Sequence, residues 1–354
     1  MANLKLSKSK IEKNDEFYTR LEDIEKEIVH YKKYFEGKTV FCNCDDPYES
    51  NFFKYFALKF NFFKLKRLIA TCYNGSSISN DEVALWTTDN ETGERKRALK
   101  AVIIMDELYD ANEDGAVDED DVKLMLQKPG AIAELKGNGS FDSPECIELL
   151  KESDIVCTNP PFSKFRDFIN VLMKYEKKFI IIGNTNAITY KEVFKHIKDN
   201  KIWLGVSSFN TGMYFYVPDN YNYRLDYKSD RSKENKKVIR VSSVCWFTNL
   251  EHHKRNEPLY LIKQYKGHEQ DYPKYDNYDA IEVSKVENIP YDYDGVMGVP
   301  ITFLDKYCPD QFEIIDLNPY FFSLVAQGLE KPKQLSLHNV NKKDPYARIL
   351  IRRK

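Results

Sequence analysis

The sequence has no long apolar run and no closely paired cysteines. No apolar segment approaches the roughly 20 residues that a helix needs to cross a bilayer, and the polar start, "MANLKLSKSKIEKNDEF", lacks the apolar core of a secretion signal. The seven cysteines are scattered without C-x-x-C spacing, which argues against a disulfide framework and against a zinc module. These absences predict a cytoplasmic protein that makes no membrane contact.

Strong net charge, internal repeats and long linkers are lacking too. A formal net charge of −2 excludes a uniformly basic nucleic-acid binder, although a local basic patch is still compatible with it. Residues 221–240 carry seven basic and three acidic side chains among tyrosines, and residues 331–354 carry eight basic side chains and one acidic. Both segments suit a phosphate backbone, and each alone could equally be a solvated loop or tail.

From residue 38 to about 205, short apolar runs alternate with amphipathic ones, which is typical of an α/β sheet. The strands are predicted at "KTVFCN", "LKRLIAT", "SDIVCTN" and "KKFIIIGN", and the helices at "ESNFFKYFALKF", "SKFRDFINVLMKY" and "TYKEVFKHIKDN". The later segments "GMYFYVP" and "VIRVSSVCWFTNL" supply strands without intervening helices. We therefore expect a sheet that finishes in antiparallel strands, followed by a less regular, Tyr- and Pro-rich lobe.

One predicted strand, "SDIVCTN", runs into two prolines and a phenylalanine before a helix. Its groups would lie in the crevice outside the carboxyl ends of the sheet, where α/β proteins bind ligands. Pro160 and Pro161 fix φ and remove N–H donors, Asn159 adds a side-chain carbonyl, and Phe162 offers a flat apolar face. An amine on a planar ring could donate to Asn159 and to the Pro160 carbonyl while the ring stacks on Phe162.

Such pairing would shift electron density onto the amine nitrogen. The pattern therefore predicts in-line methyl transfer from a sulfonium donor, with Asn159, Pro160, Pro161 and Phe162 as the catalytic residues. The alternative is a rigid turn that contains two prolines by accident.

Around this turn the sequence resembles amino-methyltransferases that use S-adenosylmethionine. Over nearly its whole length it is similar to the EcoRI modification methylase family of DNA adenine N6 methyltransferases. The similarity rests on "KNDEFYTRLEDIEKEI", "VFCNCDDPYESNFFKYF", "GNGSFDSPECIELLKESDIVCTNPPFSKF" and "YDNYDAIEVSKVENIPYDYDGVMGVPITFLDKYCPDQFEII". It implies a Rossmann-like methyltransferase domain over residues 1–250, with antiparallel terminal strands, and a C-terminal DNA-recognition lobe over residues 251–354.

The resemblance also implies the cofactor contacts. The candidates are Tyr18 and Thr19 for the methionine part, Cys44, Asp45, Asp46, Ser50 and Asn51 in the turn after the first strand, and Phe141 with Asp142 for the adenine. The sequence departs from the usual pattern here. The turn has no Gly and so adopts φ > 0 less easily, Thr71, Cys72 and Tyr73 replace a ribose-binding acid, and Ser140 replaces an acid beside Phe141.

The activity implied is methylation of a flipped adenine in double-stranded DNA by a monomer. Such an enzyme is either half of a restriction–modification pair, with a cognate restriction endonuclease encoded nearby, or a solitary phage or mobile-element methylase. One alternative keeps the chemistry and changes the substrate to RNA or to a protein glutamine, but the resemblance of the C-terminal lobe weighs against it. The other is an inactive DNA-binding relative, and the intact N-P-P-F motif weighs against that.

An acidic segment, "DANEDGAVDEDD" at residues 110–121, has the spacing of an EF-hand loop. The ligands would be Asp110, Asn112, Asp114, the Ala116 carbonyl, Asp118 and Asp121. The last position is Asp rather than Glu, and no clear helix precedes the loop. The pattern predicts a structural Ca²⁺ site, and its alternative is a solvated acidic loop.

Overall fold

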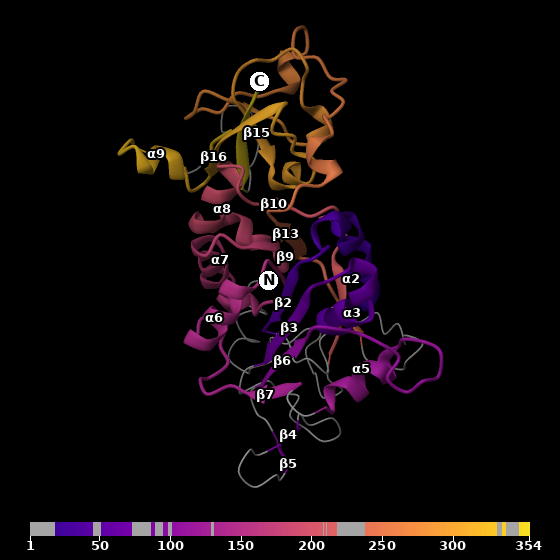
Figure 1. Ribbon diagram of the computed structural model, residues 1–354. Helices are drawn as coiled ribbons and strands as arrows, with labels where there is room; N and C mark the ends of the chain where they lie inside the picture. Colours follow the sequence, from indigo (N-terminus) through magenta and orange to yellow (C-terminus); the bar gives the residue numbers. More distant parts are fainter. Residues whose placement is uncertain are drawn as a thin grey trace. The chain divides into compact units, whose positions relative to one another are not determined.

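The chain folds into two compact units (Figure 1). The computed structural model describes residues 18–44, 51–72, 86–88, 95–97, 101–128, 131–207, 209, 211–217, 238–330, 335–337 and 347–354. The first unit comprises residues 1–187 and 211–250, and the second comprises residues 188–210 and 251–354. None of the helices within the described ranges has the length and apolar character that a membrane crossing requires.

A mixed sheet forms the centre of the first unit. Its strands lie in the order β13 (Val244–Thr248), β9 (Lys178–Asn184), β8 (Ile155–Thr158), β2 (Thr39–Asn43), β3 (Arg67–Cys72), β6 (Ala101–Met105) and β7 (Ile132–Glu134). The pairs β9–β8, β8–β2 and β2–β3 are parallel, whereas β13, β6 and β7 pair antiparallel with their neighbours. The α/β class predicted from the sequence is confirmed, with antiparallel strands on both sides of a parallel centre.

Helices cover both faces of this sheet. Figure 1 shows α6 (Pro144–Glu152) and α7 (Phe165–Lys174) on one side, and α2 (Leu21–Ile28) and α3 (Asn51–Leu58) on the other. Aromatic side chains fill the space under α3, where the Phe56 ring centroid lies 5.2 Å from that of Phe35. Because α3 joins β2 to β3, and α7 joins β8 to β9, the carboxyl ends of these parallel strands meet at one edge.

The remaining elements of the first unit are short. Strands β1 (Tyr18–Thr19), β11 (Met213–Tyr216) and β12 (Val238–Val241) form a small antiparallel sheet, and β4 (Trp86–Thr88) pairs with β5 (Arg95–Arg97). A 3₁₀ helix (Val29–Tyr34) follows α2, another (Phe162–Lys164) precedes α7, and the unit also contains the short helices α4 (Phe60–Phe63) and α5 (Glu119–Leu126). Through β1, the start of the described chain is held against a segment about two hundred residues later.

The second unit is built on a smaller sheet. Its strands lie in the order β14 (Ile281–Glu282), β15 (Met297–Pro300), β17 (Arg348–Arg353) and β16 (Phe312–Asn318), with β10 (Trp203–Leu204), α8 (Lys191–Lys198) and α9 (Phe322–Ala326) elsewhere in the unit. Two features of this unit differ from the organisation predicted from the sequence. Helix α8, predicted with the α/β pattern, belongs to this unit, and part of the basic C-terminal segment forms β17 between two other strands.

Candidate active site

The Asn-Pro-Pro-Phe turn lies where the sequence predicts it, between a buried strand and a helix. Asn159 directly follows β8, whose four residues are all buried. Pro160 is buried, and Asn159, Pro161 and Phe162 are each partly exposed. The turn closes with a hydrogen bond of 2.9 Å from the Lys164 N–H to the Pro161 carbonyl, and α7 begins one residue later. The turn thus lies at the carboxyl end of the parallel strands, with Pro161 and Phe162 partly exposed.

Tight packing beneath the turn fixes the start of α7. Phe165 is the first residue of this helix, and its ring lies against Gly183 of β9. The centroid of the Phe165 ring is 5.0 Å from that of the Phe247 ring. A Cβ on Gly183 would overlap the Phe165 ring. The glycine is therefore required for the ring to sit directly on the strand backbone.

A hydrogen bond ties β8 to its neighbour β2. The Thr158 hydroxyl donates to the carbonyl of Asn43, the last residue of β2, and both side chains are buried. Backbone pairing between β2 and β8 ends earlier, at Phe41 and Val156, so the hydroxyl prolongs the contact to the strand ends. It bridges 115 positions of sequence and fixes the Asn-Pro-Pro-Phe turn beside the turn after β2.

The buried polar atoms that have no hydrogen-bond partner among the described residues include the Oδ1 of Asn43 and the Oγ1 of Thr19, both close to these strand ends. The Asn43 side chain is almost fully buried. A buried polar atom left without a partner costs about 1–3 kcal/mol. Atoms of this kind are suited to a polar ligand, and both residues belong to the segments that hold the predicted cofactor candidates.

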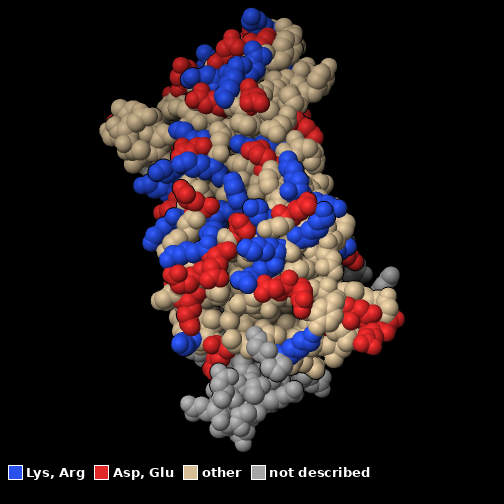
Figure 2. All heavy atoms as spheres, in the orientation of Figure 1, with Lys and Arg blue, Asp and Glu red and all other residues tan. Residues whose placement is uncertain are grey.

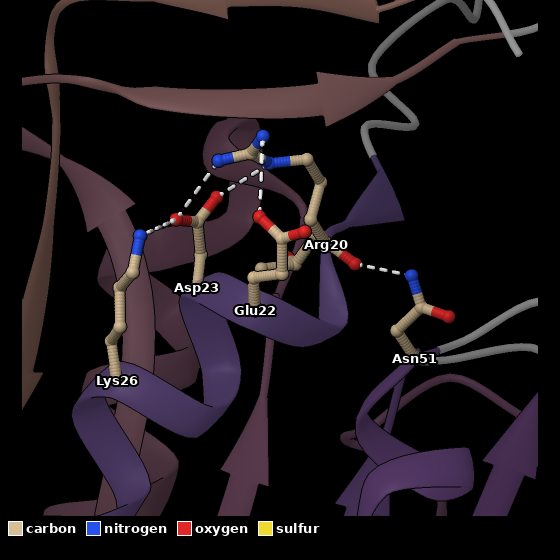
Figure 3. Close-up of polar contacts among 6 residues, drawn as sticks. Arg20, Glu22, Asp23, Lys26 and Asn51 are labelled. Carbon is tan, nitrogen blue, oxygen red and sulfur yellow. Dashed lines mark hydrogen bonds and ion pairs between the residues drawn. The ribbon is translucent and has the colours of Figure 1, made fainter. Parts of the chain in front are cut away.

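Two contacts of Thr19, together with those of its neighbour Arg20, hold Thr19 in place. Strand β1 pairs with β11, and the side chain of Asn51, at the start of α3, donates to the Thr19 carbonyl at 2.5 Å. The next residue, Arg20, places its guanidinium 4.9 Å from the centroid of the Tyr214 ring and forms two hydrogen bonds to Asp23, of 2.9 and 3.1 Å. Figure 3 shows Arg20 over the first turn of α2 and Asn51 reaching toward the Thr19 backbone.

The turn after β2 uses a non-glycine residue with positive φ. Cys44 has a φ of 68°, a conformation that costs an L-residue roughly 1–2 kcal/mol. The missing glycine therefore does not prevent a left-handed turn at the position where related enzymes have their glycine-rich segment. Of the other predicted cofactor residues in this turn, Asn51 supports Thr19, whereas Asp45, Asp46 and Ser50 lie outside the described residues.

The other predicted cofactor residues lie in the loop before α6. The Phe141 ring is buried and packs edge-on against Phe168 of α7, at 5.1 Å between centroids, whereas Asp142 is exposed and accepts a hydrogen bond from Ser140. The Glu145 carboxylate accepts from the N–H groups of Lys136 and Gly137. The structure thus gives Phe141 a packing role under α7, and its contact with a cofactor adenine stays a prediction.

The structure does not support the predicted calcium site. The Asp121 carboxylate accepts hydrogen bonds from the N–H groups of Asp118, Ala111 and Asn112, which lower its pKa, with Asp118 contributing most. The Asp110 carboxylate likewise accepts from the Asp114 and Gly115 N–H groups. In the parts of the chain that the structure describes, no cluster of His, Cys, Asp or Glu is arranged to hold a metal ion. The acidic side chains accept hydrogen bonds from the loop's own backbone N–H groups, and Asp118 caps the amino end of α5.

Comparison with known proteins identifies the family. A family model described as "Adenine-specific methyltransferase EcoRI" matches residues 5–354. The chain belongs to this family of methyltransferases. It is 44% identical to the Type II methyltransferase M.EcoRI of Escherichia coli, over 99% of this chain and 97% of that protein. It is 38% identical to M.MgeORF184P of Mycoplasma genitalium and to M.MpnI of Mycoplasma pneumoniae, over 98% of each pair of chains. No solved structure gives a significant match.

The membership confirms the resemblance drawn from the sequence and the enzyme class, an adenine-specific methyltransferase. Sequence reasoning nevertheless missed several residues that build the site. For Asn43 and Thr158 the sequence gave one indication: Asn43 is the polar end of the predicted strand "KTVFCN", and Thr158 is the polar residue before the end of the predicted strand "SDIVCTN". No sequence pattern indicated Arg20 or Glu145, because their roles depend on backbone groups and rings that folding brings near them.

Proposed function

We propose that this protein transfers a methyl group from S-adenosylmethionine to the N6 atom of an adenine within a specific sequence of double-stranded DNA. The observation that carries the proposal is the Asn-Pro-Pro-Phe turn at the carboxyl end of β8, tied through Thr158 to the end of β2. Membership of an adenine-specific methyltransferase family supports the choice of base, and the Type II methyltransferases among its relatives support DNA.

The catalytic turn acts by positioning the base and by electrostatics. The Asn159 side-chain carbonyl and the Pro160 carbonyl accept the two hydrogens of the adenine amine, which raises the electron density on its nitrogen. That nitrogen attacks the methyl carbon in line, the carbon–sulfur bond breaks as the nitrogen–carbon bond forms, and the nitrogen then loses one proton. The bound cofactor supplies the methyl group as a sulfonium, so the leaving thioether is neutral. Phe162, partly exposed on the turn, stacks on the base.

The cofactor lies, in this proposal, between the turn after β2 and strand β1. Its polar groups satisfy the Asn43 Oδ1 and the Thr19 Oγ1, and the remaining contacts come from the candidates named from the sequence: Tyr18, Cys44, Asp45, Asp46, Ser50, Asn51, Phe141 and Asp142. The sheet then works as a Rossmann-like methyltransferase domain spanning residues 1–250. Residues 251–354 form the target-recognition lobe.

The target base must leave the duplex to reach the turn. Flipping a paired base out costs about a few kcal/mol, which contacts with the DNA backbone have to offset. The proposal includes action as a monomer in the cytoplasm, either alongside a cognate restriction endonuclease or as a solitary methylase.

The experiment that tests the function is sequencing of genomic DNA from a methylation-deficient host that expresses the protein. One motif carrying N6-methyladenine is the expected result. An unmodified genome with soluble, cofactor-binding protein would indicate an RNA or protein glutamine substrate. Loss of cofactor binding as well would indicate an inactive DNA-binding relative.

Phe162→Ala is expected to weaken capture of the flipped base because the stacking surface is removed. Stacking of a base on an aromatic side chain is worth roughly 1–3 kcal/mol, so KM for DNA should rise by about five- to a hundredfold. Steady-state kinetics with duplex DNA measure the effect, and Phe162→Tyr, which keeps the ring, serves as the matched control. Equal KM values for Phe162→Ala and the wild type would show that another ring holds the base.

A further inference from the structure

The second unit carries an uncharged projection of unusual composition. We call residues 319–329, which include α9, the hook. From Asn318 to Leu329 the chain has no charged side chain, and Tyr320, Val325 and Leu329 are 40%, 50% and 53% exposed. Figure 2 shows no acidic or basic atoms where Figure 1 draws α9. Large apolar side chains that are exposed together are informative, because single ones are common on any surface.

The hook is firmly anchored. Phe321 is fully buried in the core of the second unit, and its N–H donates to the Leu317 carbonyl at 2.6 Å. The carboxylate of Asp316, also buried, accepts hydrogen bonds from the N–H groups of Ser323 and Leu324 at 2.9 and 3.3 Å. The exposed side chains are therefore presented by a fixed backbone.

A basic helix of the same unit lies against the hook. The Phe194 ring of α8 is 6.0 Å from the Phe322 ring, and the Lys198 ammonium donates to the Ser323 hydroxyl. Lys191 and Lys195, one helical turn apart, are exposed and form no ion pair within the described part of the chain. In Figure 2, Lys and Arg side chains gather over α8 next to the uncharged α9.

We propose that the hook and α8 together form a contact surface for the DNA duplex. Lys191 and Lys195 bind backbone phosphates, and the apolar side chains of the hook enter the adjacent groove. This combination of a phosphate-binding row and an apolar wedge is one that DNA-binding proteins use. The inference rests on the proposed function, since it supplies part of the backbone binding that base flipping requires.

A second copy of the chain is a less suitable occupant of this surface. Two copies meeting hook to hook about a twofold axis would also bring their α8 helices near each other. The unpaired ammonium groups of Lys191 and Lys195 would then repel, whereas phosphates neutralise them.

Two double variants test the surface, with DNA binding measured by anisotropy over a range of salt concentrations. The probe is a short fluorescein-labelled duplex that carries the motif methylated by the wild type, or mixed-sequence duplexes where no motif is found. Lys191→Gln with Lys195→Gln should lower the slope of log Kd against log salt by about 2, because two phosphate contacts are lost. Val325→Ser with Leu329→Ser should weaken binding by about tenfold and leave the salt slope unchanged, because apolar contacts are lost and no phosphate contact is.

Matched controls have equally exposed side chains elsewhere. Lys66→Gln with Lys178→Gln removes two lysines at the amino ends of β3 and β9, and Val29→Ser removes a valine of similar exposure. All controls should bind as the wild type does. The substituted positions are exposed, so folding should be preserved, and each double variant tests the surface by itself.

The outcomes separate this inference from the proposed function. If the wild type methylates DNA and both double variants bind DNA as the controls do, the proposed DNA-contact surface is refuted and the proposed function stands. If the wild type neither methylates nor binds any duplex, both fail. Hook variants that turn a dimer into a monomer in light scattering, with unchanged DNA affinity, would assign the hook to a second copy.

Discussion

Replacing Asn159 with alanine is expected to lower kcat for adenine methylation by about a hundred- to a thousandfold. The side-chain carbonyl accepts a hydrogen from the reacting amine, and loss of one such group directed at the reacting atoms typically costs this much. Asn159 lies after β8, whereas the cofactor candidates lie on β1, in the turn after β2 and in the loop before α6, so affinity for S-adenosylmethionine should be nearly intact. Single-turnover methylation together with equilibrium dialysis of the cofactor measures both quantities.

The control for this substitution is Ser163→Ala, two positions after Pro161 in the same turn. Ser163 is exposed and has no role in the proposed chemistry, so kcat should be unchanged. Comparable activity in Asn159→Ala and Ser163→Ala would mean that the reacting amine binds elsewhere. A large fall in cofactor affinity in Asn159→Ala would instead give this residue a role in forming the cofactor site.

Arg348→Met is expected to lower the unfolding free energy of the second unit by about 3–5 kcal/mol, the usual effect of breaking a buried ion pair by removing one partner. The Arg348 guanidinium binds the Glu282 carboxylate with Nε at 3.0 Å and Nη2 at 2.7 Å, and both side chains are largely buried. Tyr275 also donates to Glu282, and burial together with that carboxylate raises the pKa of Tyr275. The variant leaves the Glu282 charge in the interior with the Tyr275 hydroxyl.

Urea unfolding followed by circular dichroism measures the loss. Arg352→Met, on the same strand but exposed, should stay within about 0.5 kcal/mol of the wild type. Adding Glu282→Gln to Arg348→Met should recover part of the stability, because the buried charge disappears. Equal stability of Arg348→Met and Arg352→Met would show that water reaches Glu282 in the folded protein.

The secondary structure around the Asn-Pro-Pro-Phe turn could be predicted because it depends on residues that are close together in the sequence. The runs "KTVFCN" and "LKRLIAT" become β2 and β3, and "SDIVCTN" becomes β8, since a fully buried strand needs an apolar residue at nearly every position. The Asn-Pro-Pro-Phe turn follows β8 because the prolines cannot continue the strand's hydrogen bonding. For the acidic loop, residue spacing alone wrongly predicted a calcium site. Its carboxylates accept hydrogen bonds from nearby backbone N–H groups, and the spacing of residue types does not reveal such bonds.

The sequence by itself determined the α/β class, the position of the Asn-Pro-Pro-Phe turn and the family. These features depend on residue types that follow one another in the sequence, such as the apolar residues of a strand and the prolines that end it. Only the tertiary structure decided that Thr158 reaches the Asn43 carbonyl, that β1 pairs with β11, and that the uncharged hook stands beside the lysines of α8. These contacts join segments separated by more than a hundred residues, and burial and hydrogen bonding across the folded core select them.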